Sequence, residues 1–421
     1  MSTPGNAIVR AEEVVARCKR LASFSEDAGS TRRTFLSAPM RDCHREIGDW
    51  LTAAGAEVVV DAVGNLRGFY SAAESGAPRL LIGSHLDTIP NAGAYDGVLG
   101  VVLAAALLET LNGRRLPFGI EVVGFSEEEG VRFGTPFIGS RALVGGLDEE
   151  LLNRQDANGI SVRTAMENFG LRPAEIPRAV LGDGTLAYLE FHIEQGPVLD
   201  SLGLPLGVVE TIAAQTRMEF VFLGRANHAG TTPMHLRHDA VAAAAEWIIA
   251  VERTAQSYPE LVATVGQIAV KPGTINVIPG EARLTLDLRH ESDDTCAGAG
   301  EALVRLAEEI ARRRGLTLRR RVLLSQRAVE MDPFLVEQTE EAIRKIGCQP
   351  HRMISGAGHD AMILAEKVPA AMIFLRSPDG ISHDPAESVN LADVAKALEC
   401  GLQLLDQLAS SAKSQKRMCR A

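Results

Sequence analysis

Paired cysteines, long apolar runs and an excess of basic residues are all missing from this sequence. Its six cysteines form no Cys-x-x-Cys pair, which argues against a disulfide framework and favours reduced, buried thiols in a cytoplasmic protein. They are Cys18, Cys43, Cys296, Cys348, Cys400 and Cys419. The longest apolar run, from Gly97 to Leu108, is shorter than the roughly 20 residues of a membrane span, and residues 1–20 lack the apolar core of a secretory signal. We therefore expect a cytoplasmic protein with no membrane partner.

The charge balance excludes another class of partner. Lys and Arg number 43 against 54 Asp and Glu, which gives a net charge of -11. An acidic chain of this kind is not expected to bind nucleic acid or an anionic membrane. Small anionic substrates stay open, because the local field of a site can oppose the field of the whole molecule. With 46% hydrophobic and 23% charged residues over 421 positions, the composition is that of a soluble enzyme of two to three domains.

Polar residues that suit a metal follow an apolar strand early in the chain. Residues 79–84 are predicted to form a buried strand, and His85 and Asp87 come directly after it. Asp96 follows a Gly-rich loop and precedes the apolar segment 97–108, which is predicted to form a helix that continues through Leu111. Open α/β sheets carry their chemistry at the carboxyl ends of strands. We interpret this stretch as a metal-binding turn in which Asp87 orients His85, the alternative being a histidine that only forms structural hydrogen bonds.

Three further strands end in similar residues. The predicted strand 120–125 precedes three consecutive glutamates, the strand 187–193 contains His192, and His383 follows the strand 370–375. A close cluster of carboxylates is costly unless a cation or solvent relieves it. The alternatives are a solvated acidic loop for the glutamates and a satisfied core residue for His192, but the recurrence at separate strand ends favours one shared site.

The order of predicted elements indicates two domains. Helices are expected over 8–24 and 40–54, and strands over 58–61 and 65–70, before the strands already described. From about residue 212 to 328 the order strand, helix, two strands, helix, strand predicts an inserted ferredoxin-like α+β domain, whose second strand region spans 262–270. The fold class is therefore α/β: a catalytic domain (1–211 and 329–421) with a mixed sheet flanked by helices, plus the inserted domain. The polar, basic tail 410–421 is predicted to be disordered.

Imidazole and carboxylate groups are ligands for borderline divalent ions, and paired metals typically share one bridging carboxylate. With no thiolate in the set, two Zn, Mn, Co or Ni ions are chemically acceptable. Such ions lower the pKa of bound water, and a nearby glutamate that is not a ligand can accept the proton. The predicted reaction is hydrolysis, although the chemistry alone does not decide which of Glu127, Glu128 and Glu129 is ligand or base.

Several motifs together carry a family resemblance. They are Gly-Ser-His-Leu-Asp-Thr (83–88), Tyr-Asp-Gly (95–97), Glu-Glu-Gly-x-Arg-Phe (128–133), His-Ile-Glu-Gln-Gly-Pro (192–197), Asn-His-Ala-Gly-Thr-Thr-Pro (227–233) and Gly-Ala-Gly-His-Asp-Ala (356–361). From about residue 10 to 409 the chain resembles the M20 metallopeptidase clan. Within the clan it resembles the amidase branch of N-carbamoyl-L-amino-acid hydrolases, allantoate amidohydrolases and ureidoglycolate hydrolases.

The resemblance implies a role for each matching residue. The implied metal ligands are His85, Asp96, Glu129, His192 and His383, with Asp96 as the bridge. Glu128 becomes the general base and Asp87 the residue that orients His85. The resemblance also implies that the inserted domain is a lid that forms a homodimer, with His228 as an oxyanion donor, often in the partner's site. The implied substrate contacts are Gln195, Arg217, Asn276 and Arg289.

Some of these residues also have plainer interpretations. Arg289 could clamp a carboxylate with its fork of donors or form a surface ion pair, and Asn276 could serve only the backbone of a turn. His359, in a Gly-rich loop, is as well suited to supporting a ligand as to a structural role. The histidines expected to be structural are His44, His235, His238, His290 and His351.

The sequence therefore predicts a binuclear amidohydrolase that cleaves the carbamoyl or ureido C–N bond of a small anionic substrate. This substrate is an N-carbamoyl-L-amino acid or a ureido acid such as allantoate. An aminoacylase or dipeptidase of the same clan is the alternative within the class. A non-catalytic binding protein is disfavoured because Glu128 and every ligand are present.

Overall fold

The computed structural model describes residues 4–418. They divide into two compact units, the first running up to Glu210 and again from Met331 onward, and the second from Thr211 to Glu330. The predicted domain limits, 212 and 328, lie within two residues of this division. Among the described helices, none has both the length and the apolar character needed to cross a bilayer.

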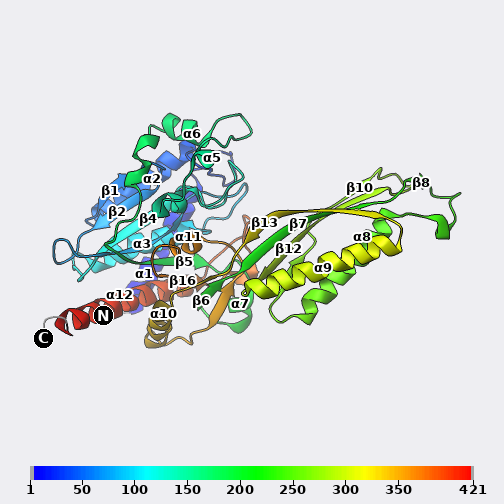
Figure 1. Ribbon diagram of the computed structural model, residues 1–421. Helices are drawn as coiled ribbons and strands as arrows, with labels where there is room; N and C mark the ends of the chain where they lie inside the picture. Colours follow the sequence, from blue (N-terminus) through cyan, green and yellow to red (C-terminus); the bar gives the residue numbers. More distant parts are fainter. Residues whose placement is uncertain (1–3, 419–421) are drawn as a thin grey trace. The chain divides into compact units, whose positions relative to one another are not determined.

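The first unit is built on a mixed sheet of nine strands (Figure 1). The strand order is β1-β2-β4-β3-β5-β16-β6-β14, and β15 pairs with β6. The central strands β4, β3, β5 and β16 pair in parallel, so their carboxyl ends meet at one edge, where open α/β sheets place their chemistry. The strands are β1 (Glu57–Val60), β2 (Leu66–Tyr70), β3 (Arg79–His85), β4 (Gly119–Phe125), β5 (Thr185–Ile193), β6 (Leu206–Ile212), β15 (Arg352–Ser355) and β16 (Ala370–Leu375). The remaining strand, β14 (Val329–Glu330), belongs to the range of the second unit and pairs with the last two residues of β6.

Helices cover both faces of this sheet. In β5, Glu190 accepts a hydrogen bond from the backbone of α11, whereas the next residue, Phe191, lies against α3 and α12. Because successive residues of a strand point to opposite faces, α11 lies on one side of the sheet and α3 with α12 on the other. The helices of this unit are α1 (Pro4–Ala22), α2 (Ala38–Ala53), α3 (Val98–Leu111), α4 (Ile138–Val144), α5 (Glu149–Leu152), α6 (Val162–Asn168), α7 (Val198–Leu202), α10 (Pro333–Lys345), α11 (Asp360–Leu364) and α12 (Leu391–Met418), with the short 3-10 turns η1 (Pro173–Arg178) and η3 (Pro378–Gly380).

Helix α3 is buried along nearly its whole length. It is apolar on all sides, as expected for a helix enclosed by other elements. A Cβ atom at Gly100 would lie 2.1 Å from the carbonyl oxygen of Phe191, so only glycine lets the helix approach β5 this closely. The close packing fixes the start of α3, and with it Asp96, beside the carboxyl end of β5.

The second unit is an antiparallel sheet with two helices, α8 (Ala240–Ser257) and α9 (Asp293–Arg313), on one face. The strand order is β10-β12-β7-β13, with β9 also paired to β12. Alternate residues of β12 are buried against the helices, where Trp247 packs on Phe220 with ring centroids 4.3 Å apart. The strands are β7 (Ala214–Leu223), β9 (Val262–Thr264), β10 (Ile268–Lys271), β12 (Glu281–His290) and β13 (Thr317–Gln326), and a separate pair is formed by β8 (Asn227–His228) and β11 (Val277–Ile278), next to the turn η2 (Met234–Leu236).

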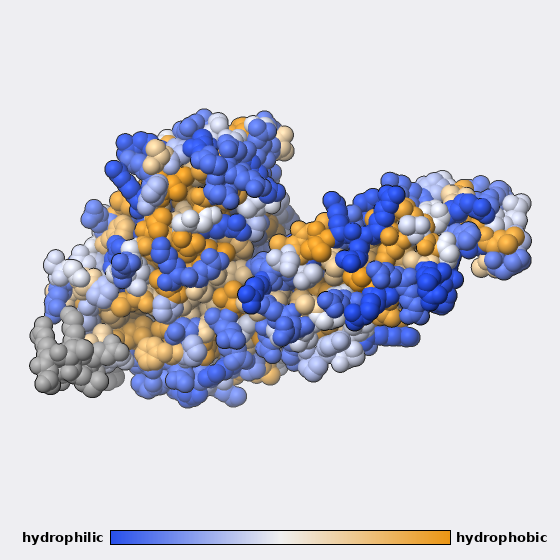
Figure 2. All heavy atoms as spheres, in the orientation of Figure 1, coloured by the Kyte–Doolittle hydropathy of each residue, from blue (hydrophilic) through white to orange (hydrophobic). Residues whose placement is uncertain are grey.

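Large apolar side chains stay exposed on the second unit. Val322 and Leu323 of the edge strand β13 are 54% and 45% exposed. Ile249, Ile268 and Ile275 are exposed as well. Figure 2 shows apolar residues interspersed among the hydrophilic ones on this unit. Apolar residues on an open edge strand are a common feature of surfaces that pair with another chain.

The structure corrects two predictions of local structure. Residues 410–418 are helical and extend α12, whereas we predicted a disordered tail; this stretch contains no Pro or Gly that would end the helix. Residues 419–421 lie outside the described part. The single strand predicted over 262–270 is two strands, β9 and β10, which both pair with β12. The predicted mixed α/β architecture with helices flanking the sheet is confirmed.

Candidate metal centre

Four strand ends bring the predicted ligands together. His85 is the last residue of β3 and pairs in register with Phe125, the last residue of β4, after which Glu128 and Glu129 follow. His192 lies near the end of β5 opposite Phe374 of β16, and His383 follows in the next loop. Asp96 reaches the same edge from the loop that precedes α3. The parallel register thus explains why residues almost 300 positions apart converge.

Asp96 lies between the three histidines. Its Oδ1 atom is 3.7 Å from Nε2 of His85 and 3.3 Å from Nε2 of His192. Its Oδ2 atom is 3.1 Å from Nε2 of His383, which in turn lies 3.7 Å from Oε1 of Glu129. Each carboxylate oxygen therefore faces a different set of ligand atoms.

Two groups with the geometry of a metal site share this carboxylate. In the first, His85, Asp96 and His192 have ligand atoms within 4.8 Å of one another. In the second, the same holds for Asp96, Glu129 and His383. All five predicted ligands belong to these two groups, and their nitrogen and oxygen atoms fit two borderline divalent cations bridged by Asp96.

The two buried histidines are held in the tautomer that a metal requires. Nδ1 of His85 lies 3.0 Å from the carbonyl oxygen of Asp87, and Nδ1 of His192 lies 2.9 Å from that of Ile193. With a proton on each Nδ1, a cation bound at Nε2 would take the place of a proton shared there with Asp96. The predicted contact between His85 and the Asp87 carboxylate is longer, at 3.6 Å, so it is the main chain of Asp87 that orients the imidazole.

The carboxylate of Asp87 instead holds the acidic run. Its two oxygens accept hydrogen bonds from the backbone N–H groups of Glu128 at 2.9 Å and Glu129 at 3.0 Å. This contact fixes the register that the sequence left open, because it turns these two glutamates toward His85. Glu127 joins none of the candidate metal groups among the described residues.

Electrostatics also favour a cation here. Burial raises the pKa of Glu129 to about 7, with a further contribution from the charge of Asp96. Burial raises the pKa of Glu128 well above its usual value, and Glu129 adds to the effect although His85 opposes it. Burial acts on Asp96 in the same direction, but hydrogen bonds with His383 and His85 hold its pKa well below the usual value. A divalent cation would relieve the repulsion among these carboxylates.

Gln195 is a further group at the centre. Its Nε2 atom donates to both oxygens of Asp96 at 3.1 Å, and its backbone N–H donates to the Ser377 hydroxyl. The backbone of Gln195 is left-handed, with φ of 59°. Its buried Oε1 has no hydrogen-bond partner among the described residues. This carboxamide oxygen is thus available to accept an N–H group from a ligand.

The other predicted substrate residues lie in the second unit, in two separate places. Arg217 and Arg289 both donate to the Asp287 carboxylate, at 2.9 Å from each Nε. Asn276 accepts a hydrogen bond from the backbone of Ala229 and adjoins β11, which pairs with the strand that carries His228. Arg217 and Arg289 lie near the start of β7. His228, which Asn276 adjoins through β11, comes after the end of β7.

Sequence reasoning missed several residues that surround the ligands. Glu387 accepts hydrogen bonds from the backbone of Tyr95 and Asp96. Glu190 accepts from Ser84 and Ala361, and its position two residues before His192 on one strand could have indicated it. A lone glutamate four residues after His383 carries no comparable signal.

The histidines outside the proposed ligand set differ in their surroundings. His359 is buried with its ring centroid 4.5 Å from that of His192 and its Nε2 2.9 Å from the Ser355 hydroxyl. It therefore packs against a ligand. None of the five histidines expected to be structural belongs to a candidate metal group in the described part of the chain.

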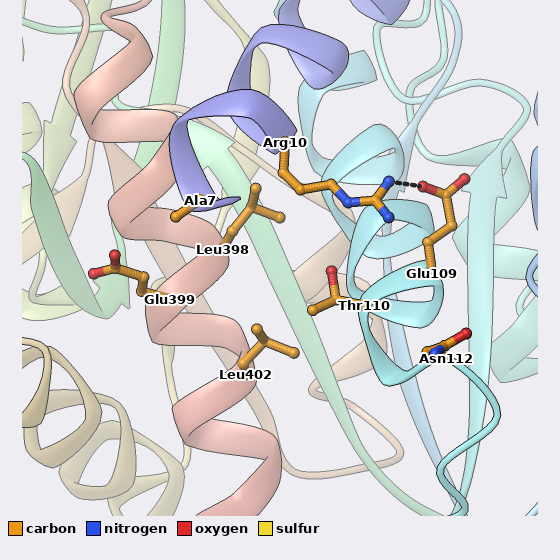
Figure 3. Close-up of a pocket in the computed structure, with 8 residues that line it drawn as sticks. All are labelled: Ala7, Arg10, Glu109, Thr110, Asn112, Leu398, Glu399 and Leu402. Atoms are coloured by element: carbon orange, nitrogen blue, oxygen red, sulfur yellow. Dashed lines mark hydrogen bonds and ion pairs between the residues drawn. The ribbon is translucent and has the colours of Figure 1, made fainter. Parts of the chain in front are cut away.

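A cavity of about 330 Å³ lies elsewhere in the first unit, between α1, α3 and α12. Figure 3 shows Arg10 crossing toward Glu109, with which it forms an ion pair of 3.0 Å. Glu109 is near the carboxyl end of α3, roughly 20 Å along the helix from Asp96 at 1.5 Å per residue. The cavity therefore does not contribute to the metal centre.

Comparison with known proteins decides the family. The model of peptidase family M20/M25/M40 matches residues 81–407. The chain belongs to this family. Some members of the family align with this chain over nearly its full length. An N-carbamoyl-L-amino acid amidohydrolase of Geobacillus stearothermophilus is 39% identical over 411 residues, which cover 96% of this chain and 99% of the relative.

Two further comparisons place the chain in the amidase branch of the M20 family. An allantoate amidohydrolase of Escherichia coli is 36% identical over 395 residues, covering 92% of this chain and 96% of the relative. The crystal structure of an amidase of the hydantoinase/carbamoylase family from Burkholderia multivorans matches with a TM-score of 0.89 and 31% identity, over 94% of this chain and 97% of that one. The predicted family resemblance is confirmed.

Proposed function

We propose that this chain is a binuclear metal-dependent amidohydrolase. Its substrate is a small N-carbamoyl-L-amino acid or an allantoate-type ureido acid, whose carbamoyl or ureido C–N bond it hydrolyses. The observation that carries the proposal is the Asp96 carboxylate, which faces two ligand groups at once with Glu128 beside them. The full-length similarity to enzymes named for these two substrates supports the substrate class.

In this proposal the residues of the centre have distinct roles. His85 and His192 would hold one cation, Glu129 and His383 would hold the other, and Asp96 would contribute to both groups. Zn, Mn, Co and Ni all suit these ligands. Bound cations polarise a carbonyl oxygen and lower the pKa of water. Glu128 accepts a proton from the attacking water and passes it to the departing nitrogen. Its burial, which raises its pKa, suits it to this role.

One water balances the reaction. Its oxygen adds to the carbamoyl carbon, the C–N bond to the rest of the substrate breaks, and that nitrogen leaves as an amine with the proton that Glu128 carried. The carbamic acid that remains decomposes to ammonia and carbon dioxide without a further water. Oε1 of Gln195, which has no hydrogen-bond partner within the described part of the chain, accepts an N–H of the ureido group and so orients it toward Glu128.

Recognition of an anionic substrate falls to the second unit. Two guanidinium groups, of Arg217 and Arg289, share the single carboxylate of Asp287, an arrangement suited to binding a further carboxylate. His228 and Asn276 are proposed to contact the scissile group. The exposed apolar residues of β13 support a homodimer formed through this unit. A cytoplasmic location stays a prediction.

A substrate panel tests the proposal. Metal-reconstituted protein is assayed for ammonia release from allantoate and from N-carbamoyl-L-methionine, and for acetate release from an N-acetyl amino acid. We expect turnover of a ureido or carbamoyl compound, and loss of activity on chelation that is restored by one of the four metals. Turnover of the acetyl compound alone would establish the aminoacylase alternative, and no turnover of either ureido compound would refute the proposal.

The general base has its own test. Glu128→Gln removes the proton acceptor but neither ligand group, so metal content should stay at two equivalents while kcat falls by about 10²-fold or more. Elemental analysis and steady-state assays of the same preparation measure both. A fully active variant would show that another residue accepts the proton.

A further inference from the structure

Glu387 connects two segments that carry metal ligands. Its side chain is 5% exposed. Oε1 accepts hydrogen bonds from the backbone N–H groups of Tyr95 at 2.8 Å and Asp96 at 3.1 Å. Oε2 is 3.3 Å from the hydroxyl of Ser382, the residue before His383. One carboxylate thus joins the backbone of the bridging ligand to the loop of another ligand.

The loop that carries His383 needs such support. His85 and His192 are buried at strand ends, whereas the His383 side chain is 48% exposed. The backbone of His383 is left-handed, with φ of 58°, a conformation that is unfavourable for a non-glycine residue. Of the three histidine ligands, His383 is therefore the one that packing fixes least.

The packing around Glu387 leaves it little freedom. A Cβ atom at Gly93 would lie 2.5 Å from both Cβ and Oε1 of Glu387. The Gly-rich loop before Asp96 therefore packs against Glu387 at a distance that only a glycine, which has no Cβ atom, permits. An added methyl group at Gly93 would displace Glu387 without removing any of its atoms.

We propose that Glu387 is a positioning residue that holds Asp96 and His383 at the spacing a cation requires. It thereby sets the divalent-cation affinity of the Asp96–Glu129–His383 group. The inference rests on the proposed binuclear centre. The first group depends less on Glu387, because its two histidines are fixed by β3 and β5. Loss of such outer support typically weakens metal binding 10- to 100-fold.

Two substitutions of Glu387 distinguish the effect of its hydrogen bonds from the effect of its charge. In Glu387→Gln the amide oxygen keeps both backbone donors, and the amide N–H₂ donates to the Ser382 hydroxyl, which can accept. In Glu387→Ala two buried N–H groups lose their acceptor. The glutamine variant should therefore restore what the alanine variant loses.

The experiment is a calorimetric titration of the metal-stripped full-length protein with Co²⁺. The wild type should bind two equivalents, and His383→Ala identifies which step belongs to the second group. We expect Glu387→Ala and Gly93→Ala to weaken that step at least 10-fold and to change the other step less than threefold. Glu387→Gln should remain within threefold of wild type at both steps.

Asp332→Ala is the control for a general loss of stability. It removes the carboxylate that caps α10, at the amino end of β16 and away from the ligands, so both Co²⁺ affinities should be unchanged.

Wild-type affinity at the second step in folded Glu387→Ala would overturn the inference. So would equal weakening by Glu387→Gln and Glu387→Ala. If Glu387→Ala does not fold, Gly93→Ala replaces it in the test, and wild-type affinity of this variant at the second step would overturn the inference. A wild type that binds no Co²⁺ would instead refute the proposed metal centre.

Discussion

Asp87 and Glu387 each accept hydrogen bonds from two backbone N–H groups, but they do so with different numbers of oxygen atoms. Each oxygen of Asp87 accepts from a different backbone N–H, whereas a single oxygen of Glu387 accepts from two. An amide in place of the carboxylate keeps one acceptor oxygen. Glutamine can therefore replace Glu387, but asparagine cannot replace Asp87.

Asp87→Asn should lower kcat/KM by about 10- to 100-fold, because one of the two N–H groups that fix Glu128 and Glu129 meets an N–H₂ donor. The matched control is Asp332→Asn, where asparagine caps a helix as well as aspartate does. Steady-state assays with elemental analysis of both variants measure the effect. Unchanged activity in Asp87→Asn would show that the acidic run is held by other contacts.

His44 gives the first unit a dependence on pH. Burial lowers its pKa to about 3, and its two ring nitrogens have no partner among the described residues. The unfolded chain binds a proton near pH 6.5 and the folded chain does not, so stability decreases as pH falls below 6.5 by about 1.4 kcal/mol per pH unit.

His44→Leu should remove this contribution, which amounts to about 2 kcal/mol between pH 6.5 and pH 5. Urea unfolding of wild type and variant at pH 7 and pH 5 measures it, with His351→Leu as the control for loss of a partly exposed imidazole. The same decrease in stability for wild type and His44→Leu would contradict the assignment.

At the scale of elements, α3 shows how closely the site depends on packing. Gly100→Ala places a methyl group against the Phe191 carbonyl, and such overpacking costs about 1–3 kcal/mol. Gly48→Ala in α2 is the control, because its Cβ would meet Val58 at an ordinary 3.5 Å and alanine favours a helix. Thermal unfolding should show a lower Tm for the first variant and an equal or higher Tm for the second. Equal Tm values for Gly100→Ala and wild type would show that α3 can move.

The elements that carry the ligands were predictable because their patterns are strong. The apolar run of α3 and the central strands have one interpretation each, and the polar residues after them mark the sheet edge. The short helices between residues 138 and 168 have too few turns for a periodic signal. Glu387 was out of reach for another reason, since its role depends on a contact between residues 291 positions apart.

At the scale of the whole molecule, the second unit separates its two sets of proposed substrate residues. Gln215 pairs with Arg289 and Leu223 with Glu281, so eight residues of β7, about 27 Å at 3.4 Å per residue, separate Arg289 from the strand end that precedes His228. A small substrate cannot span that length. Arg289 and His228 of one chain therefore cannot contact the same substrate, which supports a dimer in which His228 serves the partner's site.

Mixing two inactive variants tests this arrangement. His228→Ala keeps an intact metal centre, and Glu128→Gln keeps His228, so mixed dimers formed after dissociation and reassociation should regain about a quarter of wild-type activity. The control mixture of His228→Ala with the double variant His228→Ala/Glu128→Gln should regain none. No recovery in the first mixture, with mixed dimers detected, would place His228 in its own subunit's site.

The position of β16 determines when the first unit can be completed during synthesis. This strand lies between β5 and β6 in the sheet, yet the ribosome makes it only after the entire inserted unit. Until Leu375 emerges, the nascent chain carries unpaired edges of β5 and β6, and such edges promote association with other chains. Translation of residues 213–369 is therefore the interval in which the growing polypeptide most needs a chaperone.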